Sequence, residues 1–141
     1  MAVDADTLAA LLADRLGAIV PAGFHVRAEA GMLWYSADEG RFPGQGGDGR
    51  AGTACSPIEA NIGVYGSTDA DNIVGVAVQA LGELQDYIDE ATHEPWPGGT
   101  IPPRLGAEIR DSAVHLWYGD HDSEALSCEP IPLAAVVRLA G

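Results

Sequence analysis

The chain has 141 residues, with 7 basic side chains against 21 acidic ones, so its formal net charge is −14. Every basic residue is an arginine, because the sequence contains no lysine. This balance excludes a basic footprint for nucleic acid or for an anionic membrane, and it excludes Schiff-base and P-loop chemistry, which require lysine. The 47% apolar content is too high for a disordered chain, so a single domain is expected over residues 1–141.

The first half of the chain predicts one helix followed by three strands. Asp4 or Asp6 can cap a helix whose apolar residues recur three and four positions apart and which ends before Pro21. A glycine-rich segment over 40–52 cannot hold regular structure and separates the second strand from the third. The strands are expected at 24–29, at 32–36 and within 54–65.

The second half begins with a longer predicted helix. Asp69 or Asp71 can cap it, and its apolar stripe continues to about Ala91, where the prolines and glycines of 93–100 end it. Further strands are expected at 107–110, at 113–118 and from about Ala125, while 133–139 fits a strand or a short helix.

Two segments of the chain resemble each other. Residues 26–35 align without gaps on residues 109–118 and share Leu-Trp-Tyr, and Cys-Ser-Pro-Ile at 55–58 matches Cys-Glu-Pro-Ile at 128–131. The shared order favours a duplication over a chance likeness of two amphipathic hairpins. The interpretation predicts pseudo-repeats at about 5–66 and 69–139, with a glycine-rich insertion at 41–52 in the first.

Strand alternation predicts a candidate interface. Side chains alternate between the two faces of a sheet, and two helices can cover only one face of the expected sheet. The other face would then expose an aromatic patch, unless the chain itself covers it. Trp96, between two prolines, either packs over the sheet edge or serves as an exposed anchor. The candidate interface residues are Met32, Trp34, His115, Trp117 and Trp96.

A second set of residues could bind a small ligand. The glycine-rich loop 41–52 could close as a lid over a pocket near His93 and Trp96, although it lacks the lysine and Ser/Thr of a P-loop. The alternative is a loop insertion without a binding role. The candidate ligand residues are Arg41, Asp48, Arg50 and His93.

No catalytic residues, metal site or cofactor are predicted. Glu90 and His93 have the spacing of two metal ligands on a helix, but no matching motif lies on the other predicted helix. Cys55 and Cys128 lie in apolar strands without Cys-x-x-Cys spacing, which is typical of inert, reduced thiols. The acidic amino terminus lacks the basic region of a signal peptide, and no apolar run could span a membrane, so a cytoplasmic protein is expected.

The phrases PAGFHVRAEAGMLWYSADEGRFPG and VGVAVQALGELQDYIDEATHEPWPG, with the order of the elements, resemble a group of small acidic proteins from high-GC actinobacteria. The resemblance covers nearly the whole chain, and it implies no activity and assigns no functional residue. The small size, the acidity and the expected architecture also resemble the type III secretion chaperone class, a likeness of architecture that rests on no motif.

These observations predict an α+β domain with two helices packed on one face of a 5–6-stranded antiparallel sheet. The expected function is that of a non-enzymatic protein-binding module, chaperone-like or inhibitor-like, with a protein partner or a homodimer. The alternative is a small-ligand-binding protein or an enzyme that uses loop 41–52.

Overall fold

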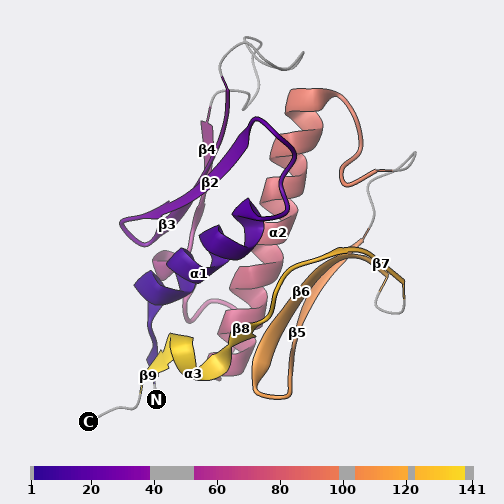
Figure 1. Ribbon diagram of the computed structural model, residues 1–141. Helices are drawn as coiled ribbons and strands as arrows, with labels where there is room; N and C mark the ends of the chain where they lie inside the picture. The colour runs from indigo at the N-terminus through magenta and orange to yellow at the C-terminus, as the bar shows by residue number, and fades with distance from the viewer. Residues whose placement is uncertain (1, 39–52, 99–103, 121–122, 139–141) are drawn as a thin grey trace.

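The computed structural model describes residues 2–38, 53–98, 104–120 and 123–138. Figure 1 shows one long helix, α2 (Asp69–Thr92), with a three-stranded sheet on one side and a four-stranded sheet on the other. The protein is therefore α+β with antiparallel sheets, as predicted. The expected single sheet is wrong in the described residues, because the strands form separate sheets that both pack on α2.

The first sheet carries the shorter helix α1 (Ala5–Gly17) across it (Figure 1). Asp4 caps this helix, since its carboxylate accepts a hydrogen bond from the Thr7 backbone N–H at 3.2 Å. The strands lie in the order β2-β3-β4 and comprise β2 (Phe24–Glu29), β3 (Met32–Ala37) and β4 (Thr53–Pro57). A single 3-10 turn, η1 (Glu59–Asn61), then leads toward α2.

The second sheet has its longest strand at the centre. Strand β6 (Ala113–Asp120) pairs with three others, β5 (Leu105–Arg110), β7 (Ser123–Ser127) and β8 (Ile131–Pro132). The final segment contains one helical turn, α3 (Leu133–Val136), and then β9 (Val137–Arg138), which pairs with β1 (Ala2–Val3). The sequence predicted a strand or a short helix over 133–139, and the structure has a helical turn followed by a short strand. Residues 139–141 lie outside the described residues.

The amino end of α2 differs from the prediction. Asp69 and Asp71 do not cap it but lie in its first turn, and the cap is Thr68, whose hydroxyl accepts from the Asp71 N–H at 3.1 Å. Thr68 has the extended backbone of an N-cap, with φ −108° and ψ 155°. The two aspartates still stabilise the helix, because negative charge is favourable near its amino end.

Two buried tyrosines attach the two sheets to α2. The Tyr118 hydroxyl donates to the backbone carbonyl of Leu81 at 2.7 Å. The Tyr35 hydroxyl donates to the backbone carbonyl of Ala80 at 3.3 Å and shares a shorter hydrogen bond, 2.5 Å, with the Ser56 hydroxyl. Both side chains are completely buried, and this burial raises the pKa of each phenol. The phenols therefore stay protonated at neutral pH and act as donors.

The register of the hairpins explains part of the internal sequence likeness. Tyr35 lies opposite Val26 in the first hairpin and Tyr118 lies opposite Leu105 in the second. The gap-free alignment pairs Arg27 with Arg110, yet the strand partner of Trp34 is Arg27 whereas that of Trp117 is Gly106. The second hairpin turn therefore lies two residues further from Leu-Trp-Tyr, and the aligned arginines do not occupy matching positions.

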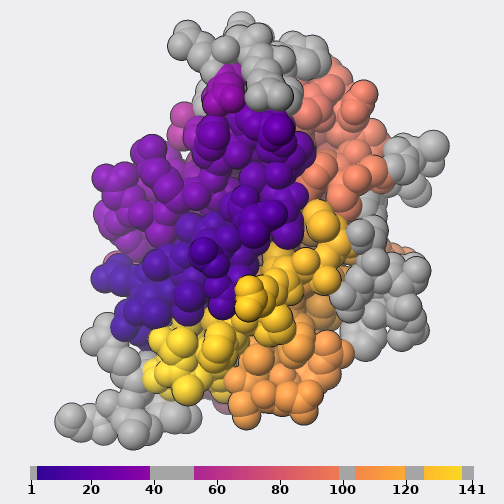
Figure 2. All heavy atoms as spheres, viewed as in Figure 1, coloured from indigo at the N-terminus to yellow at the C-terminus, as the bar shows by residue number. Residues whose placement is uncertain are grey.

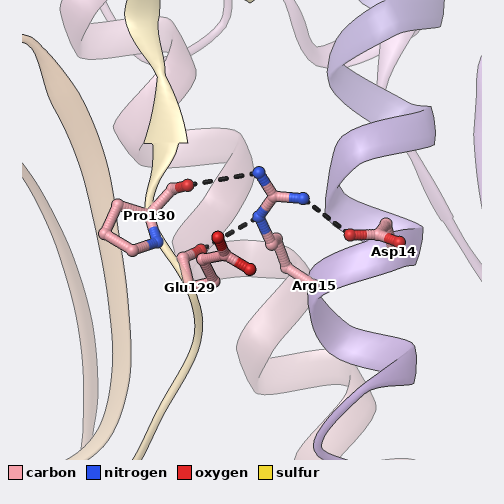
Figure 3. Close-up of polar contacts among 4 residues, drawn as sticks. All are labelled: Asp14, Arg15, Glu129 and Pro130. Atoms are coloured by element: carbon pink, nitrogen blue, oxygen red, sulfur yellow. Dashed lines mark hydrogen bonds and ion pairs between the residues drawn. The ribbon is translucent and has the colours of Figure 1, made fainter.

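Arg15 fastens α1 to the carboxyl-terminal part of the chain (Figure 3). Its guanidinium donates to the backbone carbonyls of Glu129 at 3.1 Å and Pro130 at 3.2 Å, and it forms an ion pair with Asp14 at 2.6 Å. In the space-filling view, the yellow segment that contains α3 lies between α1 and the orange strands (Figure 2). Arg15 thus ties α1 to the connection between β7 and β8, on the opposite sheet.

We expect Arg15→Met to lower the free energy of unfolding by about 1–3 kcal/mol, because two charge-assisted hydrogen bonds to backbone carbonyls are lost. Urea denaturation monitored by circular dichroism measures this change. Arg15→Lys is the control and should recover less than half of the loss, since one ammonium cannot reproduce the fork of the guanidinium. Equal stability of the methionine variant and the wild type would contradict this role.

Candidate functional site

The residues predicted to form an aromatic interface are divided between the two sheets. Met32 and Trp34 are half-buried on the outer face of the first sheet, and the Arg27 guanidinium lies 5.9 Å from the centre of the Trp34 ring. His115 is half-buried on the second sheet, where Trp117 is 8% exposed. Alternation along each strand is as predicted, but a continuous tryptophan patch would require the single sheet that the described residues do not form.

The indole of Trp117 occupies the space that a side chain at residue 106 would fill. A Cβ on Gly106, its strand partner, would come within 2.7 Å of the ring. The glycine therefore leaves the space in which the indole covers the strand, and this accounts for the low exposure of Trp117.

Trp96 packs against the rest of the chain and is not an exposed anchor, but it lies in the core cluster and not merely over the sheet edge. Its ring centre lies 4.6 Å from that of Tyr118 in an edge-to-face arrangement, and its side chain is 8% exposed. Two side chains of α2 bind its backbone, since Asp89 accepts from the Trp96 N–H at 2.7 Å and Gln85 donates to the Trp96 carbonyl at 3.0 Å. These two hydrogen bonds hold the segment that follows α2 against the side of the same helix.

Of the predicted ligand residues, His93 alone lies in the described part of the chain. His93 is exposed and ends α2 in a left-handed conformation, with φ 58°. Arg41, Asp48 and Arg50 lie outside the described residues, as does the loop 41–52. The lid hypothesis therefore stays a prediction.

Neither metal binding nor thiol chemistry gains support within the described ranges. They contain no group of three or more side chains able to hold a metal ion. Both cysteines are free, and burial raises the pKa of the Cys128 thiol to about 11, although Arg15 opposes the shift. That thiol stays protonated at neutral pH and is a poor nucleophile. Among the described residues, no helix has the length and apolar character needed to cross a membrane.

The most distinctive surface lies at the amino end of α2, in the loop that leads into it. Val64 and Tyr65 are 65% and 39% exposed, and they are the exposed large apolar side chains of the described residues. Such side chains bind partners effectively when the backbone that carries them is already ordered. The sequence interpretation placed both near the end of a strand and did not single them out.

Asn72 orders this loop from within α2, where its side chain is 5% exposed. Its amide oxygen accepts from the backbone N–H groups of Gly63 at 2.7 Å and Tyr65 at 3.1 Å. Its amide nitrogen donates to the carbonyls of Gly66 at 3.1 Å and Thr68 at 2.9 Å. All four bonds go to backbone atoms, so Asn72 holds the loop whatever side chains the loop presents.

The Tyr65 ring rests on α2 because residue 75 is a glycine. A Cβ at Gly75 would overlap the ring, and the Tyr65 hydroxyl donates to the side-chain oxygen of Gln79. Gln79 in turn donates to Glu83 at 2.6 Å, which also accepts from Ser56 at 3.0 Å. A continuous polar network therefore connects the exposed tyrosine with the buried Ser56.

Two hollows adjoin this loop. The first, which we call the acidic hollow, measures about 400 Å3 and contains three carboxylates. The second, which we call the apolar groove, measures about 670 Å3 and is lined mainly by apolar atoms. The acidic hollow is lined by residues 3–6, Glu59 and Ile62. The apolar groove is lined by residues 68–70, Ser112, Leu133, Ala134 and Val137.

The sequence contains only a weak signal for this surface. Val64-Tyr65 lies between Gly63 and Gly66, which marks a turn but does not say that the apolar pair faces solvent. Comparison of the chain with models of protein families, with curated proteins and with solved structures finds no match.

We expect Asn72→Ala to loosen the loop, because four backbone groups lose their partner and exchange it for water. Hydrogen exchange measured by mass spectrometry should be at least tenfold faster over residues 63–68, with a smaller change at the carboxyl end of α2. Asn72→Asp is the matched control, since it keeps the accepting oxygen and should give an intermediate effect. Unchanged exchange in the alanine variant would refute the role of Asn72.

Burial raises the pKa of Asp89, although the hydrogen bond from Trp96 opposes the shift. The folded state therefore binds a proton at Asp89 more tightly than the unfolded state does. The free energy of unfolding falls as the pH rises through the pKa of Asp89 in the unfolded chain and then through its higher pKa in the folded protein. Asp89→Asn keeps an accepting oxygen without the charge. We expect it to match or exceed the wild type in unfolding free energy at pH 7.

The advantage of Asp89→Asn should disappear below about pH 3.8, the ordinary pKa, where the wild-type carboxyl is neutral in both states. Asp89→Ala, which lacks an acceptor for Trp96, should be less stable than both. Thermal unfolding over a pH series measures these differences. An asparagine variant that is less stable than the wild type at pH 7 would contradict the assigned direction.

Proposed function

We propose that the chain is a non-enzymatic protein-binding module, of a chaperone-like or inhibitor-like kind, whose partner docks at the amino end of α2. The observation that carries the proposal is the exposure of Val64 and Tyr65 on a loop that Asn72 holds through four backbone hydrogen bonds. A tyrosine held in place loses little freedom on binding and contributes a large contact area.

Charge supports a partner other than a second copy of this chain. Each copy carries a formal charge of −14, so two copies repel each other, whereas a basic protein is attracted. Near the loop, Glu59 and Asp71 are exposed and reinforce this preference locally. The proposed partner therefore has a basic surface around an apolar depression.

We also propose that the two hairpins and their third strands derive from one duplicated unit. The Leu-Trp-Tyr segments support this, because Leu33 and Tyr35 of the first sheet and Leu116 and Tyr118 of the second are all buried in the same core cluster, and both tyrosines bind α2. Each strand of the second hairpin has two more residues between Leu-Trp-Tyr and the turn, or between the turn and the paired residue, so the hairpin is four residues longer, and this accounts for the failure of the arginine match.

The binding function is tested by affinity capture with three tagged versions of the chain. These are the wild type, the double variant Val64→Ser/Tyr65→Ser and the control variant Ala22→Ser. Ala22 is exposed and follows the carboxyl end of α1. The double variant should keep its fold, since the bonds from Asn72 reach only backbone atoms; circular dichroism checks this.

We expect the wild type and the control to capture a common protein from a lysate of the source cells, in similar amounts by quantitative mass spectrometry. The double variant should capture at least tenfold less of it. Capture that is equal for all three versions, or capture of nothing but a second copy of the chain, would overturn the proposal.

A further inference from the structure

The acidic hollow and the apolar groove adjoin across a single pair of strands. Val3 lines the acidic hollow and Val137 lines the apolar groove, and these two residues are partners in the β1–β9 ladder. Residues paired in this way lie about 5 Å apart, so the linings of the two spaces approach each other within the width of one strand pair. A segment of a few extended residues is long enough to cross this pair.

The apolar groove is suited to aliphatic or aromatic side chains. Its volume of about 670 Å3 lies within the range of binding clefts, and Ala70 and Ala134 expose only methyl groups toward solvent. The groove is also built on fixed elements, because the Leu133 N–H donates to the Ser112 carbonyl at 2.9 Å and so holds α3 against the β5–β6 turn. Asp69, at its rim, adds one carboxylate.

The acidic hollow is suited to a cation. Asp4, Asp6 and Glu59 line it, and no basic residue is among the lining residues that the structure describes. Within the described residues, Arg15, Arg27 and Arg110 each pair with a carboxylate elsewhere, namely Asp14, Glu29 and Glu108. A smaller hollow that shares Asp6 continues along α1 toward Glu29, so the acidic lining extends beyond one site.

We propose that the two spaces together receive one short, extended segment of the protein partner, with an apolar side chain in the groove and an arginine or lysine in the acidic hollow. Charge complementarity selects this occupant, because carboxylates lie in or beside both spaces and the chain as a whole carries −14. This inference rests on the proposed binding function and specifies the chemistry that the partner presents.

The test uses a display library of random 12-residue peptides, selected on the intact chain, followed by synthesis of the enriched peptides. Affinity is measured by fluorescence anisotropy for two site variants, Asp6→Asn/Glu59→Gln and Ala134→Trp. The acidic control is Asp86→Asn/Glu94→Gln, which neutralises two exposed carboxylates toward the other end of α2. The control for bulk is Ala22→Trp, and Ala70→Trp replaces Ala134→Trp if the latter does not fold.

We expect the enriched peptides to combine apolar residues with arginine or lysine. Each site variant should weaken their binding at least tenfold, whereas the controls should change it less than twofold, and added salt should weaken binding to the wild type. The inference is overturned if no peptide is enriched, if enriched peptides lack basic residues, or if the site variants bind as the wild type does.

The outcome is independent of the test of the proposed function. The peptide measurement does not use Val64 or Tyr65, and the capture experiment does not alter either hollow. Capture that is unchanged in the Val64→Ser/Tyr65→Ser variant, with peptide binding that the site variants weaken, would disprove the docking role of the loop. Capture that depends on Val64 and Tyr65, with peptide binding that the site variants leave unchanged, would disprove only the segment chemistry proposed here.

Discussion

Helix α2 has to be buried on two sides at once, and the rest of the fold follows from this requirement. Its buried residues span nearly its whole length, from Asn72 to Ala91, and each sheet covers part of them. Within the part of the chain that the structure describes, neither sheet has another core to pack on, because all the buried apolar residues there but Trp117 belong to one cluster. Tyr35 and Tyr118 set the position of the helix between the sheets through hydrogen bonds to consecutive carbonyls, those of Ala80 and Leu81.

The same arrangement produces the candidate binding surface. Because α2 begins where the chain returns from the first sheet, its first turns meet the loop of residues 63–68, and α3 and the β5–β6 turn reach it from the second half. Asn72 can organise the loop only because the helix that carries it is fixed by both sheets. The stability of the core and the order of the exposed Val64 and Tyr65 therefore depend on the same helix.

Local sequence signals predicted the elements well but not their assembly. The apolar periodicity of both helices and the turns at Ala30-Gly31 and Asp111-Ser112 depend on neighbouring residues, and they appear as expected. Whether strands join into one sheet depends on contacts between distant residues, which periodicity does not contain. For this reason the prediction of a single sheet was wrong, and so was the prediction that Trp34 and Trp117 share one face of it.

The candidate surface was harder still to foresee. Asn72 is a polar residue near the start of an amphipathic helix, a position at which such residues usually face solvent, and nothing in its neighbourhood says that it is buried. The acidic hollow combines residues 3–6 with Glu59, and the groove combines residues 68–70 with Leu133. Their proximity follows from the β1–β9 pairing and from the packing of α2, neither of which leaves a pattern in the sequence.

The central claim is that α2 makes the two sheets one cooperative unit, and native-state hydrogen exchange of Tyr118→Phe tests it most directly. The variant removes one buried hydrogen bond on the second sheet, at a cost of about 1 kcal/mol. If the sheets unfold together, the slowest amides of β3 and β6 should lose the same free energy of exchange. A loss confined to β6, with β3 unchanged, would show that the sheets are stabilised separately and would contradict the account.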